Sequence, residues 1–314
     1  MRFLVFFFIF FSSKVFAVYA FKNSNGEIIL KGANCQELLN EAQQIFNWAF
    51  KLKDVFQDTP LTCNYTHFLG IKWGFEINIS KITPILVKKY LNYRPTNDGP
   101  NCWNSTLVMN KISPFLRYTS PEEFSFWLKS PLCREKNSKE EMVAGDVIAI
   151  REYTGNFVDE YHGLTYISPH LSFTKNGLTH FNSYSLVPTD DVFKSYGVKE
   201  GCRLPPHQKG CQKAASVFSC QSFEQYISGP LSKDLTEALE EIDKTECAIE
   251  QLSMFGDKKN NKSLYNYVDM NVDILEWIIS DLENKKGLNE KEIFLIRALR
   301  FKINAIKSQM RLLK

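Results

Sequence analysis

The stretch that decides the fold is "GPNCWNSTLVMNKI", residues 99–112. A Gly-Pro turn precedes Cys102, and the residues after it predict a helix over 102–112. The preceding loop, "NYRPTNDGPN", is rich in Pro, Gly, Asn and Asp, which favour turns. A cysteine at a helix start is either half of a disulfide or a thiol whose pKa the helix lowers. The functional interpretation depends on which of the two Cys102 is.

The N-terminus, "MRFLVFFFIFFSSKVFAVYA", is typical of a secretory signal peptide over residues 1–20. Two possible cleavage sites, each preceded by small residues, lie after Ala17 and after Ala20. The apolar run is too short for a membrane span, and Lys14 interrupts it. Cleavage after Ala20 leaves 36 Lys and Arg against 35 Asp and Glu. We therefore expect a secreted or periplasmic protein with no integral membrane segment after signal removal, and no nucleic acid as partner.

All the cysteines follow residue 20, which in an oxidising compartment predicts disulfides. They are Cys35, Cys63, Cys102, Cys133, Cys202, Cys211, Cys220 and Cys247. Eight cysteines can pair completely, and if Cys102 is a free thiol one other cysteine is also left unpaired. Cys133 is the expected partner of Cys102 in the first case and the unpaired residue in the second. Without CxxC or HExxH, the sequence predicts no metal and no cofactor.

The pattern of apolar residues predicts an α+β protein. Helical spacing occurs in four segments before residue 131: residues 34–56, 82–91, 102–112 and 120–130. Short β-rich segments separated by turns then predict an antiparallel sheet: residues 144–153, 162–168, 171–177 and 179–187.

These elements divide the mature chain into four regions. Residues 21–90 are expected to be an N-terminal helical region, and residues 91–195 to be the core. Residues 196–230, with three cysteines, are expected to form a cysteine-rich linker. Residues 231–314 show helical periodicity throughout and predict a helical hairpin or bundle. That region is expected either to pack generically or to bind a protein partner.

A thiol nucleophile needs a base, and His162 is the best candidate because it opens a predicted strand after a polar loop. The ring then needs a third group to orient it. Asn176, in the turn after the next strand, is the leading choice. Thr174 and His170 are the alternatives, and the sequence does not separate them.

The order of Cys102 at a helix start, Gly145-Asp146-Val147 opening a strand, and His162 opening the next resembles the papain-like thiol hydrolases of the NlpC and CHAP type. The resemblance covers about residues 90–190. It implies a cysteine-bearing helix packed on a small antiparallel sheet, with Cys102 and His162 as catalytic residues. The third polar residue of the family usually lies on the strand after the histidine, where this chain has Thr174 and Asn176. The resemblance also implies oxyanion or substrate contacts from Tyr93, Asn97 and Trp103. The chain departs from the family in having "NCWNST" around the cysteine where NlpC enzymes usually carry "DCSG".

The leading hypothesis is therefore an exported cysteine peptidase or amidase that cleaves peptidoglycan peptides or another peptide substrate through an acyl-enzyme. A thiol acyltransferase would share the same site. The hypothesis from another class is a secreted, disulfide-stapled binding or scaffolding protein without catalysis, in which Cys102 pairs with Cys133.

Overall fold

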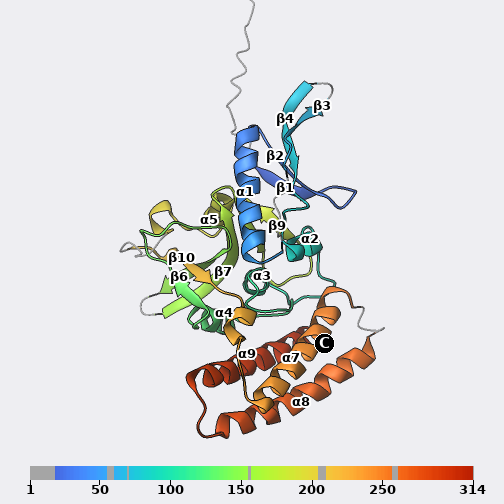
Figure 1. The fold of residues 1–314 in the computed structure, drawn as a ribbon, viewed down its shortest axis with the longest axis vertical. Helices are drawn as coiled ribbons and strands as arrows, with labels where there is room; N and C mark the ends of the chain where they lie inside the picture. The colour runs from blue at the N-terminus through green and yellow to red at the C-terminus, as the bar shows by residue number, and fades with distance from the viewer. Residues whose placement is uncertain are drawn as a thin grey trace, which may run out of the picture.

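The computed structural model describes residues 18–54, 60–68, 71–154, 157–203, 210–256 and 261–313. Within these residues the protein is mixed helix and sheet, with two antiparallel sheets, as the α+β prediction requires. Figure 1 shows a small N-terminal unit at the top, a larger sheet in the middle and three long helices below. Residues 1–17, most of the predicted signal peptide, lie outside the described residues.

The N-terminal unit is a four-stranded sheet, in the order β1-β2-β4-β3, against which helix α1 packs. Its elements are β1 (Tyr19–Lys22), β2 (Ile28–Gly32), α1 (Cys35–Lys51), β3 (Asn64–Phe68) and β4 (Ile71–Asn78). A disulfide joins Cys35 to Cys63. The prediction of a helical region over 21–90 is therefore wrong. Its strands contain the β-branched and aromatic residues that favour a sheet, and helical spacing is confined to α1 and to residues 82–91.

The second sheet has six strands in the order β5-β10-β6-β7-β8-β9. They are β5 (Cys133–Glu135), β6 (Asp146–Thr154), β7 (Phe157–Ser168), β8 (Leu171–Lys175), β9 (Tyr184–Val187) and β10 (Lys213–Cys220). The four predicted strands are all present. The linker prediction for 196–230 is wrong over 213–220, because β10 is an inner strand between β5 and β6. Its segment is buried on both faces, so its sequence lacks the alternation of a half-exposed strand.

Short helices surround this sheet. They are α2 (Ile85–Tyr90), α3 (Cys102–Met109), α4 (Pro121–Leu128), α5 (Thr189–Ser195), the 3-10 helix η1 (Glu200–Cys202) and α6 (Phe223–Ile227). Helices α3 and α4 pack on β7. Ser120 caps α4 by accepting a hydrogen bond from the Glu123 N–H. Two further disulfides join Cys133 to Cys220 and Cys202 to Cys211. Such bonds are typical of an oxidising compartment.

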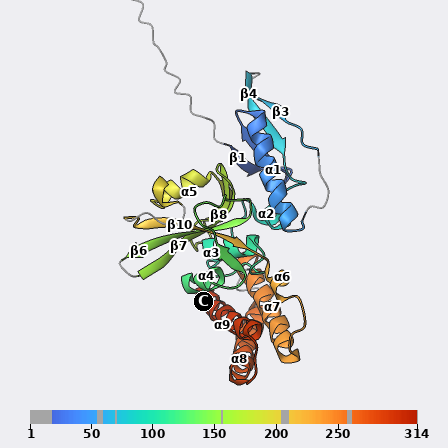
Figure 2. The same ribbon diagram turned by 60° about the vertical axis from the view of Figure 1, so that its left-hand side comes forward.

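The C-terminal region is helical, as predicted: α7 (Lys233–Met254), α8 (Lys262–Asn284) and α9 (Glu290–Leu312). Asn289 and Glu292 form a capping box at the start of α9. Figures 1 and 2 show α8 as the outer helix, packed on α7 and α9. Across the described part of the chain, no helix has the length and apolar character needed to cross a membrane.

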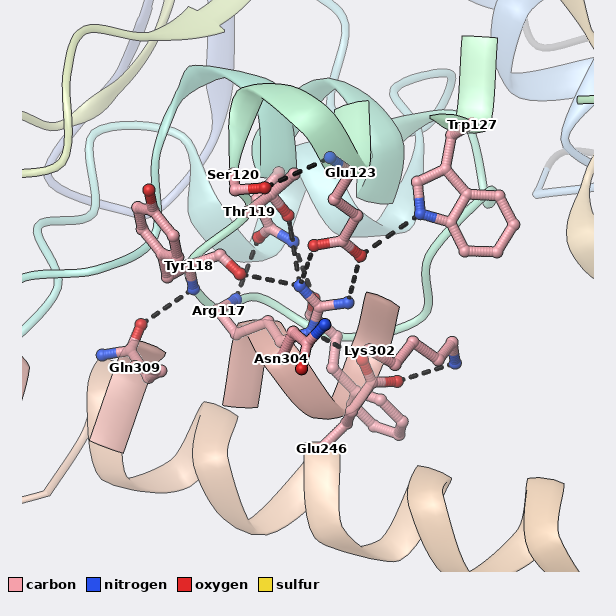
Figure 3. A network of polar contacts seen from close by, with 12 residues as sticks. Arg117, Tyr118, Thr119, Ser120, Glu123, Trp127, Glu246, Lys302, Asn304 and Gln309 are labelled. Carbon is pink, nitrogen blue, oxygen red and sulfur yellow. Dashed lines mark hydrogen bonds and ion pairs between the residues drawn. The ribbon is translucent and has the colours of Figure 1, made fainter. Parts of the chain in front are cut away.

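A buried ion network attaches these helices to the core (Figure 3). Arg117 is fully buried and forms ion pairs of 2.6 Å with both Glu123 of α4 and Glu246 of α7. Lys302 of α9 lies 2.8 Å from the same Glu246. Since a buried charge is stable only when it is paired, these residues fix the bundle against α4.

Candidate active site

Cys102 is the first residue of α3, and its thiol is free. The Asn101 side chain caps the helix by accepting a hydrogen bond from the Asn104 N–H at 3.0 Å. Only 5% of Cys102 is exposed. The predicted pairing of Cys102 with Cys133 is wrong, because Cys133 is bonded to Cys220. The other unpaired cysteine in the described chain is Cys247, not Cys133.

The backbone around the thiol is arranged to stabilise negative charge. The backbone N–H groups of Gly163, Trp103 and Cys102 itself lie beside the sulfur and lower the thiol pKa. Burial has the larger effect and raises the pKa of Cys102 to about 11. In the observed conformation the group is therefore a neutral thiol at physiological pH.

His162 is fully buried in β7, where burial lowers its pKa to about 3. The Thr174 hydroxyl oxygen lies 2.9 Å from the imidazole Nε2. The Tyr196 ring stacks on the imidazole, with 4.1 Å between the ring centroids. The other ring nitrogen, Nδ1, has no hydrogen-bond partner among the described residues. The ring is thus neutral and held in place, with one nitrogen left uncommitted.

Helix α3, which begins at Cys102, packs on β7, the strand that carries His162. Asn110, at the end of α3, donates a hydrogen bond to the Thr165 hydroxyl, and a Cβ on Gly163 would lie 3.1 Å from Thr106 of α3. Tyr196 stacks on the His162 ring and is also close enough to Cys102 for a thiolate there to raise the Tyr196 pKa. No hydrogen bond joins the thiol to Nδ1.

Strands β7 and β8 are not paired beside Gly163, because their ladder begins at Thr165 and Phe173. The Thr174 side chain lies in this gap and also donates to the Gly163 carbonyl at 3.3 Å. Of the three candidates for the orienting group, Thr174 is thus the one that contacts the ring. Asn176 is exposed and accepts a hydrogen bond from the Tyr196 hydroxyl, and His170 lies 3.7 Å from Glu37.

The residues expected at an oxyanion site have other partners. The Tyr93 hydroxyl donates to the Met254 carbonyl at 2.7 Å. The Asn97 amide donates to the Leu252 carbonyl at 2.8 Å, so both residues bind the end of α7. Trp103 is half-buried and packs against Phe124. Tyr93 and Asn97 therefore hold the loop before Cys102, and the N–H groups near the sulfur are the better oxyanion donors.

Sequence reasoning missed Lys175, a fully buried cation that follows Thr174. Its ammonium donates to the carbonyls of Gly177 and Thr179, at 3.1 and 3.0 Å. Burial lowers its pKa to about 8, while the charge of Asp98, and that of Cys102 when it is ionised, oppose that shift. Lys175 makes no ion pair within the described residues, so it can stabilise an anion formed at Cys102. The sequence feature that could have identified Lys175 is its position in the strand β8, directly after Thr174.

Sequence reasoning also missed a contact between Asp98, in the loop before Cys102, and His180. Asp98 accepts hydrogen bonds from the His180 backbone N–H at 2.7 Å and lies 2.6 Å from His180 Nδ1. Burial alone would raise the pKa of Asp98, but the bonds from His180 and the charge of Lys175 lower it. Gln309 of α9 donates to the Asp98 carbonyl at 2.8 Å. The C-terminal bundle therefore positions the residues that lead to Cys102.

Comparison with known protein families, with curated proteins and with solved structures gives no match for this chain. In the part of the chain that the structure describes, no three His, Cys, Asp or Glu side chains form a group that could hold a metal ion.

Proposed function

We propose that this protein is an exported thiol hydrolase that cleaves amide bonds with Cys102 as nucleophile. The observation that carries the proposal is the free thiol at the start of α3, with three backbone N–H groups beside its sulfur that lower the thiol pKa. One of those groups belongs to Gly163, the residue next to His162. A helix N-terminus and an adjacent imidazole are the two usual means of activating a cysteine.

In the proposed reaction, His162 Nδ1 takes the thiol proton and the sulfur attacks the amide carbonyl carbon. The N–H groups near the sulfur and the charge of Lys175 stabilise the oxyanion. The C–N bond then breaks, and the imidazolium gives its proton to the leaving amine. Water, deprotonated by the same ring, hydrolyses the thioester to a carboxylic acid and the free thiol. Thr174 orients the ring through Nε2.

The described conformation is a resting form under this proposal. The thiol and the imidazole are buried, neutral and not bonded to each other. Catalysis requires Sγ and Nδ1 to come within hydrogen-bond distance, and Tyr196 stacks on the ring that must shift. Substrate binding would supply the free energy for this change.

Peptidoglycan stem or cross-link peptides are the proposed substrate, on the resemblance to NlpC and CHAP enzymes alone. The test is digestion of purified muropeptides, followed by chromatography and mass spectrometry of the products. Wild type and Cys247→Ser should cleave an amide bond, whereas Cys102→Ser and His162→Gln should lose at least about 100-fold in rate. Unchanged activity in Cys102→Ser would refute the proposal.

One observation favours a second function, a disulfide-stapled binding protein without catalysis. Burial raises the thiol pKa and lowers the imidazole pKa, which is the opposite of an activated pair. In that case no variant at Cys102 changes any activity, and Cys102→Ala only alters stability.

A further inference from the structure

A large groove lies at the end of α3 that is farthest from Cys102. It has a volume of about 930 Å³, and three lysines line it: Lys51, Lys53 and Lys111. Among the described residues that line it, Glu224 is the only carboxylate, and the rest are amide, hydroxyl and small residues together with Leu52, Ile227 and the disulfide-bonded Cys220. We call this the basic groove. Its charge favours an anionic ligand.

Two of these lysines have an unusual backbone. Lys53 and Lys111 adopt φ angles of +58° and +55°, a left-handed conformation that ordinarily favours glycine or asparagine. The one other non-glycine residue with positive φ in the described chain is Asn92, which lies elsewhere. The Lys111 ammonium is already bonded within the protein, because it contacts Asp54 at 2.9 Å and the Leu52 carbonyl at 2.6 Å. Lys51 and Lys53 are exposed and form no ion pair with any described residue.

A mainly apolar pocket of about 490 Å³ adjoins the groove and shares Lys111, Glu224 and Ile227 with it. It lies where α2, α3, α6 and α7 meet, and its apolar lining is Ile85, Leu86, Val108, Pro114, Phe223, Ile227 and Leu239. The carboxylates of Asp54 and Asp243 lie at its edge and are paired with Lys111 and Lys302, so the anionic head is placed in the groove and not in the pocket. Ser113 also lines it. That residue is 1% exposed, and its hydroxyl has no hydrogen-bond partner among the described residues.

From this arrangement we propose that the groove and pocket together form a binding site for a single-chain amphiphile with an anionic head. The apolar chain lies in the pocket, and the head contacts Lys51 and Lys53. The pocket volume is within the range of small-molecule sites, which are mostly apolar with a few polar groups. Helix α3 separates this site from Cys102 by about 12 Å, from its eight residues and the rise per residue. The proposal does not depend on catalysis by Cys102.

The probe for the test is 11-(dansylamino)undecanoic acid, with its methyl ester as the matched uncharged ligand. Fluorescence titration of the full chain should show the acid binding about tenfold more tightly than the ester, because only the acid has a head charge. Displacement by dodecanoate or by dodecyl phosphate distinguishes a carboxylate head from a phosphate head. Failure of both to displace the probe would overturn the proposal.

Lys53→Gly separates binding from stability. Glycine suits the left-handed backbone, so the thermal midpoint should rise or stay the same, while the affinity for the acid should fall about tenfold. Asn92→Gly is the matched control: it changes a residue of the same backbone conformation outside the groove and should leave affinity unchanged. Equal affinity in Lys53→Gly and wild type would contradict the assigned role of the lysine.

Leu86→Trp tests the apolar end. Leu86 is half-buried in the pocket wall. A tryptophan ring there is larger and should lower the affinity for the acid and for the ester alike. If this variant binds both probes like wild type while its thermal midpoint is unchanged, the chain does not occupy the pocket and the proposal fails.

Discussion

The Thr174 hydroxyl oxygen lies 2.9 Å from Nε2 of His162 and bridges the ring to the Gly163 carbonyl. This contact fixes the imidazole from β8 while Nδ1 stays uncommitted. The Cys102 thiol lies beside the neighbouring residue, since the Gly163 backbone N–H lowers the thiol pKa. The thiol and the imidazole are thus linked through one glycine and its neighbours, without touching.

Tyr196 should control access to the thiol. In wild type, alkylation of Cys102 should be slow below pH 9, because the thiol is buried and its pKa is raised to about 11. Tyr196→Ala removes the ring stacked on His162 and should speed alkylation at least about tenfold. Peptide mapping after timed iodoacetamide labelling gives the rate. Tyr161→Ala, a neighbouring exposed tyrosine, is the control, and an equal effect of both would exclude gating by Tyr196.

Stability should fall with acid because His162 is buried in its neutral form. Its pKa drops from the ordinary 6.5 to about 3, so between these values the unfolded chain binds a proton that the native chain does not. Stability is therefore lost as pH falls through 6.5, by about 1.4 kcal/mol per pH unit from this group. Urea unfolding of wild type and His162→Gln at several pH values measures it. Identical slopes for the two proteins would contradict the buried neutral imidazole.

Removal of one partner should disrupt the ion network of Figure 3. Glu246→Ala leaves Arg117 and Lys302 buried with fewer charges to pair, and should cost about 3–5 kcal/mol of unfolding free energy. Glu140→Ala breaks an exposed pair with Arg134 and should change little. Denaturant titration of both variants provides the comparison. Similar losses in both would mean that the buried network does not anchor the bundle.

Gly99 should not tolerate a side chain. Its φ is +136°, and a Cβ there would lie 1.8 Å from the Gln309 amide, which binds the same loop. Gly99→Ala should therefore destabilise the chain by more than about 2 kcal/mol. Gly287→Ala has a positive φ but open space around it, so only the backbone strain remains, about 1 kcal/mol. Equal thermal shifts would show that α9 does not press on this loop.

The mature N-terminus should be Val18 rather than Phe21. Val18 is fully buried, and Tyr19–Lys22 forms β1, paired with β2. Cleavage after Ala20 would remove half of that strand, whereas cleavage after Ala17 preserves it. Intact-mass analysis of the exported chain distinguishes the two. A mass that begins at Phe21 would contradict the role of β1 in the fold.

Local signals predicted much of this structure, and long-range pairing accounts for what they missed. The caps at Ser120 and Asn289 and the stripe in α1 depend on neighbouring residues, so the sequence contains them. Strand β10 was missed because its pairing with β5 and β6 spans distant parts of the chain and leaves no alternation.

At the site, the order and spacing of residues identified Cys102 and His162 as candidates. Thr174 was predicted only as an alternative for the group that orients the His162 ring. The bonding of Tyr93 and Asn97 to α7 involves residues more than 150 positions away, which no local pattern shows. The disulfide pairing was equally inaccessible, because it depends on how β5 meets β10.

The most direct test of Cys102 as a nucleophile is its reaction with a peptidyl vinyl sulfone, a substrate-like electrophile, mapped by mass spectrometry. The predicted result is a single adduct at Cys102, formed at least about tenfold more slowly in His162→Gln, with Cys247 unmodified in the native chain. An adduct at Cys247 alone, or a rate at Cys102 that does not depend on His162, would contradict the proposed hydrolase.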